Sequence, residues 1–129
     1  MPQSPIIDDC IAACIQCSIE CDNCAEASSR MTSMGDCVQA CRKCSDTCRF
    51  CVDALQVGSY ADCDECAEAC DSCATICDRY DDEHCRKCAE ACRKCDAACR
   101  AVIDQLNLYG ALDSVPERLA RETAGPGGL

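Results

Sequence analysis

The sequence predicts an all-α protein, an antiparallel up-down-up-down four-helix bundle with a cysteine-lined core. Three observations lead to this fold. The chain has 129 residues, of which 20 are cysteine, and the cysteines fall into four groups of five. Within every group the steps alternate between three and four residues, and their mean of about 3.5 matches the core-facing seam of a helix in a bundle. Leu, Ile, Val and Phe supply only 19 residues at a net charge of −11, so we expect cysteine itself to form the core.

The cysteine groups also predict how the helices align. Short connections favour antiparallel neighbours, so the order of the cysteines reverses from one helix to the next. All 20 cysteines then fall into layers with none left over, which supports the topology. The expected layers, from one end to the other, are Cys10, Cys51, Cys63 and Cys99; Cys14, Cys48, Cys66 and Cys95; Cys17, Cys44, Cys70 and Cys92; Cys21, Cys41, Cys73 and Cys88; and Cys24, Cys37, Cys77 and Cys85.

The first helix is expected over about residues 5–27. Ser4 is a candidate N-cap, and Pro5 suits the first helical position because its missing N–H needs no partner there. A second apolar stripe runs beside the cysteines, and it either widens the core-facing side of the helix or contacts another subunit. This stripe consists of Ile7, Ile11, Ile15 and Ile19.

The second and third helices are expected over about residues 34–56 and 60–79. Both begin with a sequence that resembles a capping box, in which a serine caps the helix and an acidic residue follows three positions later. Gly58 is a suitable stop for the second helix, since glycine tolerates the left-handed conformation that follows many helices. The two starts are Ser33-Met34-Gly35-Asp36 and Ser59-Tyr60-Ala61-Asp62.

The fourth helix is expected over about residues 83–109. Three consecutive acidic residues, 81–83, put negative charge at its start, which the helix dipole favours. Gly110 is its expected end. The four helices form one domain over residues 1–109. Residues 110–129 contain Pro and Gly and lack a hydrophobic pattern, so we expect a loosely ordered C-terminal tail.

Composition argues against several classes of function. Lys and Arg number 12 against 23 Asp and Glu, so no basic surface for nucleic acid is expected. No apolar run of about 18 residues is present, which predicts no membrane span. The first ten residues lack the charged and apolar regions of a secretory signal, so we expect a cytoplasmic protein. With one His and no Trp, the chain offers little for a His-centred triad, and we expect no enzyme activity.

Several uses compete for 20 inward-facing thiols. Buried cysteine can serve as a small hydrophobe, although Leu, Val and Ala would pack without risk of oxidation. A disulfide framework needs an oxidising compartment and side-chain directions that two cysteines on one helix lack. Zinc would divide the thiolates into four-ligand sites, each with about two uncompensated negative charges in a dry core. Iron–sulfur clusters take their ligands mostly from loop motifs.

Cu(I) fits the pattern best. It is a soft ion that prefers thiolate and thioether ligands. Cysteines three or four residues apart have Cβ atoms about 5–6 Å apart, so their sulfurs can converge on one ion. If each thiolate bridges two ions, about one Cu(I) binds per cysteine, up to about 20 ions, and charge cancels along the core. The predicted ligands are Cys10, Cys14, Cys17, Cys21, Cys24, Cys37, Cys41, Cys44, Cys48, Cys51, Cys63, Cys66, Cys70, Cys73, Cys77, Cys85, Cys88, Cys92, Cys95 and Cys99.

The two ends of the predicted bundle differ. Met31, Met34 and His84 lie near the layer that contains Cys24, and thioether and imidazole are neutral copper ligands. We therefore expect copper to pass through this end, although isolated Met often fills packing gaps and His at a helix start is often exposed. The opposite end carries enough apolar residues for a plug. These are Ile6, Ile7, Phe50, Leu55, Val102, Ile103 and Leu106.

Four helices lined with cysteine in CxxxC and CxxC steps, over about residues 5–109, resemble the four-helix-bundle copper storage protein family. The missing export signal resembles its cytosolic branch. The resemblance implies cytosolic Cu(I) storage and buffering in a homotetramer, without catalysis, and we expect a copper donor or acceptor protein as partner. Two other functions stay open. A thiol–disulfide redox enzyme would need an exposed cysteine of lowered pKa, and a broader metal sink would bind zinc, cadmium or silver.

Overall fold

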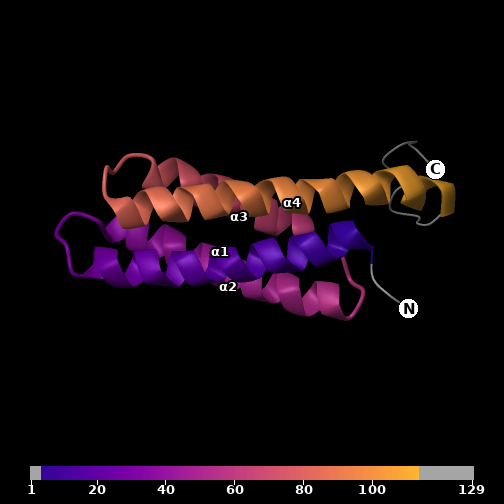
Figure 1. The fold of residues 1–129 in the computed structure, drawn as a ribbon, viewed down its shortest axis with the longest axis horizontal. Helices are drawn as coiled ribbons and strands as arrows, with labels where there is room; N and C mark the ends of the chain where they lie inside the picture. The colour runs from indigo at the N-terminus through magenta and orange to yellow at the C-terminus, as the bar shows by residue number, and fades with distance from the viewer. Residues whose placement is uncertain (1–3, 114–129) are drawn as a thin grey trace.

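The chain folds into an antiparallel bundle of four helices, as the sequence predicts (Figure 1). The computed structural model describes residues 4–113, with side chains described through residue 107. The expected tail beyond residue 113 therefore lies outside the described residues. The helices are α1 (Pro5–Ser29), α2 (Gly35–Gln56), α3 (Cys63–Cys77) and α4 (Glu83–Asp113).

Each helix packs against two neighbours. α1 and α3 both contact α2 and α4, so α1 lies diagonally opposite α3 across the bundle axis. The α1–α2 and α3–α4 connections lie at one end, and the α2–α3 connection lies at the other (Figure 1). None of the described helices has an apolar stretch that would cross a membrane.

The start of α1 has the cap that the sequence predicts. Ser4 Oγ accepts hydrogen bonds from the backbone N–H of Ile6 at 3.1 Å and of Ile7 at 3.4 Å. Pro5 occupies the first helical position. These bonds satisfy N–H groups that have no partner inside the helix, which fixes where α1 begins.

The capping boxes predicted for α2 and α3 do not form. The residue at the N-cap of α2 is Met34, whose side chain accepts no capping bond, and Ser33 adopts a left-handed φ of 66°. Asp36 lies inside the first turn, where its carboxylate accepts from the N–H of Cys37 at 2.8 Å. Asp62 precedes α3 without a side-chain capping bond. The prediction was wrong because each helix begins later than the box requires, so that the N-cap residues are Met34 and Asp62 and not Ser33 and Ser59.

Gly58 ends α2 as expected. Its φ is 86°, in the left-handed region that glycine adopts without steric cost. The N–H of Gly58 donates to the carbonyl of Leu55 at 3.1 Å, and the N–H of Ser59 donates to the carbonyl of Ala54 at 2.8 Å. This pair of bonds is a Schellman motif, which satisfies the last carbonyls of the helix.

α4 continues past the expected stop. It runs through Gly110 to Asp113, whereas the sequence pattern suggested an end at about residue 109. A single glycine costs a helix about 1 kcal/mol relative to alanine, which weakens a helix without ending it.

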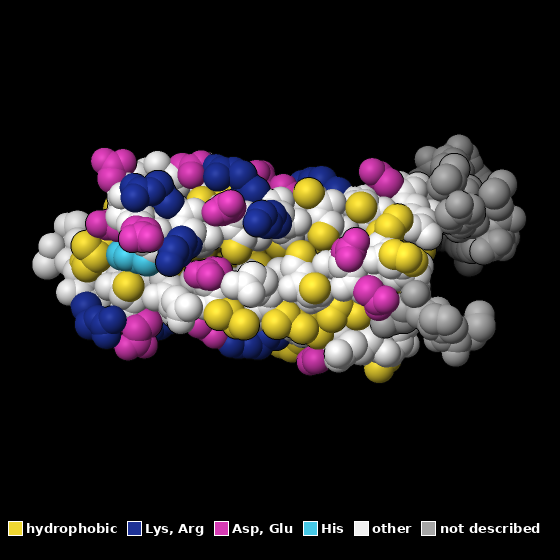
Figure 2. Space-filling model, in the orientation of Figure 1, with side chains coloured by type: hydrophobic (Ala, Val, Ile, Leu, Met, Phe, Trp, Pro, Cys, Tyr) yellow, Lys and Arg dark blue, Asp and Glu magenta, His cyan; other side chains and the backbone are white. Residues whose placement is uncertain are grey.

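Ion pairs on the surface connect neighbouring helices. Arg49 of α2 pairs with Asp22 of α1, and Arg93 of α4 pairs with Asp78 at the end of α3. All four side chains are about half exposed, so each pair contributes little to stability. Acidic and basic side chains are interspersed over the visible face, and apolar side chains gather between them (Figure 2).

Candidate metal centre

All 20 cysteines lie in the core of the bundle. Each is a free thiol, and none is more than 1% exposed. Because every step along a helix is three or four residues, each helix presents its sulfurs along one stripe facing the axis. Small residues beside the stripes, including Ala67, Ala74 and Ala89, are also buried and let the helices approach closely.

The sulfurs meet in the layers that the sequence predicts. In the middle layer, Cys17 Sγ lies 3.8 Å from Cys44 Sγ, 3.8 Å from Cys70 Sγ and 3.7 Å from Cys92 Sγ. The layer on one side has its shortest sulfur–sulfur distance, 3.4 Å, between Cys95 and Cys14. The predicted alignment of the four helices is therefore confirmed.

Adjacent layers are in contact as well. Cys17 Sγ lies 3.9 Å from Cys21 Sγ, which lies 3.8 Å from Cys92 Sγ. Cys48 Sγ lies 3.9 Å from Cys70 Sγ in the next layer. Spacings within and between layers are thus nearly equal. We call this continuous array of 20 sulfurs the cysteine ladder.

The ladder does not divide into separate metal sites. Sets of four sulfurs that lie within 4.8 Å of one another span two adjacent layers and share members. Cys17, Cys21, Cys88 and Cys92 each belong to two such sets. In isolated tetrahedral sites each cysteine binds a single metal ion, whereas a cysteine shared between two sets can bridge two ions through its thiolate. The sets are Cys14, Cys51, Cys66 and Cys99; Cys17, Cys21, Cys44 and Cys92; Cys17, Cys48, Cys70 and Cys95; Cys21, Cys73, Cys88 and Cys92; and Cys24, Cys41, Cys77 and Cys88, among others.

The surroundings of the ladder disfavour charge without metal. Among the described residues, the only buried polar or charged side chains are three serines, so no buried cation could balance a thiolate. Burial raises the pKa of Cys85 and of Cys37. Cys24 is an exception, because hydrogen bonding from Cys41 lowers its pKa to about 7 and so favours its thiolate. A metal ion that binds here must therefore displace protons and bring its own positive charge.

One end of the ladder carries the polar and thioether groups. Met34, three residues before Cys37, is 4% exposed, and His84 is half-buried at the start of α4. The imidazole is visible at the surface of this end (Figure 2). We call this end, formed by the last cysteine layer with Met34, His84 and Ser28, the mouth.

Ser28 is the mouth residue that sequence reasoning missed. It is fully buried, and its Oγ lies 3.2 Å from His84 Nε2, 3.5 Å from Cys37 Sγ and 3.8 Å from Cys24 Sγ. It therefore joins the imidazole to the last sulfurs of the ladder. The available signal was its position, because Ser28 follows Cys24 by four residues and so continues the stripe of α1.

A sequence model of the copper storage protein family matches residues 4–104. The chain belongs to this family. Among solved structures, the Cu(I)-bound copper storage protein BsCsp3 is 33% identical and superposes with a TM-score of 0.71, covering 74% of this chain and 96% of the other. The cytosolic copper storage protein from Streptomyces lividans, loaded with five coppers, is 30% identical, with a TM-score of 0.73 and coverage of 77% and 92%.

A third similar structure is apo copper storage protein 3 from Bacillus subtilis. It is 35% identical, has a TM-score of 0.70, and covers 73% of this chain and 95% of its own length. No curated protein sequence matches the chain.

Met31 and the residues predicted for the apolar plug are the remaining positions to locate in this copper storage protein. Met31 lies in the α1–α2 connection with 43% of its surface exposed, whereas Met34 is buried. At the far end, Leu55, Val102 and Ile7 are buried beside the first cysteine layer. Phe50, expected in that plug, is 67% exposed because its position on α2 faces outward. We call this apolar end the closed end.

Proposed function

We propose that the chain stores and buffers Cu(I) in the cytosol, with about one ion per core cysteine and up to about 20 ions in all. The observation that supports this proposal is the continuous ladder with shared sulfurs. If each thiolate bridges two Cu(I) ions and each ion takes two thiolates, the ligands and ions balance in number and charge. The cytosolic relative from Streptomyces lividans supports the compartment.

Charge favours Cu(I) over divalent metals. A filled ladder of thiolates and Cu(I) is neutral, whereas four thiolates around each Zn²⁺ leave about two negative charges per site. The described part of the chain has no buried Lys, Arg or His that could compensate them. Silver, also monovalent and soft, would be accepted for the same reason.

A redox enzyme is a weaker candidate. A thiol–disulfide enzyme needs one or two reactive cysteines at an exposed helix start, whereas all 20 cysteines here belong to one array in the core. The work of this protein is binding, without catalysis.

Copper passes through the mouth, with Met34 and His84 as transfer ligands and Met31 as an outer one. Neutral ligands hold Cu(I) without losing a proton, so they can capture an ion and release it to a thiolate. Ser28 lies between the imidazole and the ladder and would guide the ion inward.

A homotetramer and a copper donor or acceptor protein complete the proposal. Ile15 and Ile19 are exposed on α1, one turn apart, and form an apolar strip that a second copy of the chain could cover. We expect neither nucleic acid nor a membrane as a partner, because the chain is strongly acidic.

One titration tests the proposal. Reduced protein is titrated anaerobically with Cu(I) in the presence of a competing Cu(I) chelator, and separately with Zn²⁺. We expect a Cu(I) plateau near 20 equivalents, with about one proton released per ion. Saturation near five Zn²⁺ that Cu(I) cannot displace would reject Cu(I) storage.

A further inference from the structure

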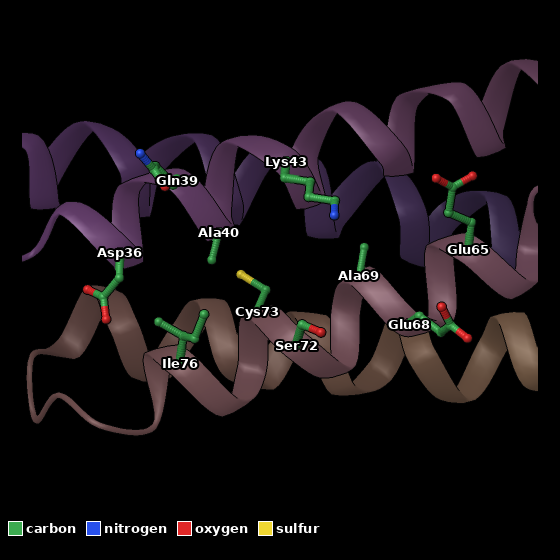
Figure 3. Close-up of a pocket in the computed structure, with 10 residues that line it drawn as sticks. All are labelled: Asp36, Gln39, Ala40, Lys43, Glu65, Glu68, Ala69, Ser72, Cys73 and Ile76. Carbon is green, nitrogen blue, oxygen red and sulfur yellow. The ribbon is translucent and has the colours of Figure 1, made fainter.

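The mouth is not the only place where the surface approaches the cysteine ladder. A groove of about 480 Å³ runs between α2 and α3, and its lining includes the ladder residue Cys73 (Figure 3). Cys73 is buried, with 1% of its surface exposed, whereas the other 19 cysteines are at 0%. Figure 3 shows its sulfur directed from α3 toward α2.

The groove exists because several side chains between α2 and α3 are small. Ala40, Ala69 and Ser72 line it with small side chains, so only a thin layer of atoms separates the buried Cys73 from the groove. The α2–α3 interface is also the least extensive of the four helix interfaces.

Asp36, at one end of the groove, bonds Arg79 and Tyr80, whereas the other charged side chains of the lining are available to a ligand. Lys43, Glu65 and Glu68 line it and are exposed, and none of them forms an ion pair among the described residues. An ammonium group and two carboxylates complement a small molecule that carries a carboxylate and an ammonium group. The volume is within the range of small-molecule sites.

We propose that this groove is a side port, at which a small zwitterionic thiol delivers Cu(I) to Cys73 or removes it. The carboxylate of the thiol pairs with Lys43 and its ammonium group with Glu65 or Glu68, which places its sulfur-bound copper beside Cys73. The proposal rests on the proposed function, because it gives Cu(I) storage a second route. It deepens that function by naming the class of carrier.

The exchange balances without an oxidant or reductant. Cu(I) held by two small-molecule thiolates passes to Cys73 and Cys88, whose sulfurs lie 3.9 Å apart. Two Cu–S bonds break and two form, the two cysteine protons move to the departing thiolates, and these leave as thiols. Cys41, with its sulfur 3.8 Å from that of Cys73, is the next ligand inward.

Stopped-flow measurement of Cu(I) transfer from a glutathione complex tests the port. Ser72→Leu narrows the groove at an exposed position, and we expect transfer to slow about tenfold. Ala97→Leu, at an exposed position on α4 outside the groove, is the matched control and should leave the rate unchanged. Transfer from a Cu(I)–acetonitrile complex, which needs no carrier site, should be equal in all three proteins.

Reversing the charge of Lys43 tests whether the groove recognises the carboxylate of the carrier, which a change in packing alone would not show. Lys43→Glu should slow transfer from Cu(I)–glutathione and leave transfer from Cu(I)–2-mercaptoethanol unchanged, because the second carrier has no carboxylate. Wild-type rates from glutathione in both Ser72→Leu and Lys43→Glu would overturn the port. A wild-type protein that binds no Cu(I) at equilibrium would instead overturn the proposed function.

Alkylation of the metal-free protein tests how accessible Cys73 is in the absence of copper. With limiting iodoacetamide and peptide mapping, we expect Cys73 to be modified before Cys70, its fully buried neighbour on α3. Ser72→Leu should remove this preference. Equal modification of Cys73 and Cys70 in the wild type would contradict a side port.

Discussion

The two ends of the bundle are closed by different chemistry. At the closed end, Leu55 and Val102 bury aliphatic side chains beside the first cysteine layer. At the mouth, contacts are polar: Ser28 bonds with His84, and Tyr80 Oη donates to Asp36 Oδ1 at 2.6 Å. An aliphatic plug excludes both water and ions, whereas hydroxyl and imidazole groups can exchange partners with either. The contrast leads us to expect that the closed end contributes more to stability, and it is consistent with the proposal that copper passes through the mouth.

The largest expected effect is on stability at the closed end. Leu55→Ala removes a fully buried side chain, and we expect the free energy of unfolding to fall by about 2–5 kcal/mol. His84→Ala at the half-buried mouth should cost far less. Urea denaturation of the reduced, metal-free proteins measures both. Equal losses would mean that the ends do not differ in how they stabilise the fold.

Replacing a whole layer of cysteines with serine separates the number of Cu(I) ions bound from the rate of Cu(I) uptake. Replacing either the first layer or the last layer should lower the Cu(I) plateau by about four ions, if one ion binds per cysteine. Only replacement of the last layer should also slow uptake, because that layer is the one at the mouth. Equilibrium titration and stopped-flow uptake with Cu(I)–acetonitrile measure the two quantities. Slower uptake after replacing the first layer would contradict a plugged end. The layers are Cys10, Cys51, Cys63 and Cys99 at the closed end, and Cys24, Cys37, Cys77 and Cys85 at the mouth.

Replacing the proposed transfer ligands should change the rate of Cu(I) uptake without changing the number of ions bound. Met34→Ala with His84→Ala should slow uptake from Cu(I)–acetonitrile about tenfold, a barrier change of about 1.4 kcal/mol, without changing the plateau. Ser28→Ala should give a smaller decrease, since it keeps both transfer ligands. Met31→Ala is the comparison for a methionine at the surface of the same end. A lower plateau in the double variant would make these residues storage ligands.

The smallest effect concerns the polar contacts that close the mouth. Tyr80 and Arg79, which follow α3, both bond Asp36 near the start of α2. The hydrogen bond from Tyr80 lowers the pKa of Asp36 below its usual 3.8, and the carboxylate raises the pKa of Tyr80 to about 12. The folded state therefore prefers an ionised Asp36 and a protonated Tyr80.

The sign of the pH dependence follows from these two directions. The contribution of Asp36 is present above pH 3.8 and is lost as the pH falls below it. The contribution of Tyr80 is complete below pH 10 and is lost as the pH rises toward 12. The difference in unfolding free energy between wild type and Tyr80→Phe should thus be constant from about pH 5 to 9 and shrink outside that range. A difference that is the same at pH 3 and pH 7 would contradict the contact.

The sequence by itself determined the ladder. Steps of three and four residues place side chains on one face of a helix whatever that helix packs against, so the 20 cysteines had to form four stripes. Antiparallel order then fixed the layers, and Gly58 and Ser4 fixed two helix ends through bonds to nearby backbone. Each of these features depends on residues within a turn or two, or on a pattern repeated in all four helices.

The tertiary structure alone decided the features that need two elements at known positions. Ser28 is a mouth residue because the start of α4 places His84 within hydrogen-bond distance of it. Asp36 accepts a hydrogen bond from Tyr80, which follows α3, instead of belonging to a capping box. The exposure of Met31 and Phe50, and the groove at Cys73, likewise depend on how far neighbouring helices stand apart. Periodicity assigns a residue to a face of its helix, but the offset between helices decides what covers that face.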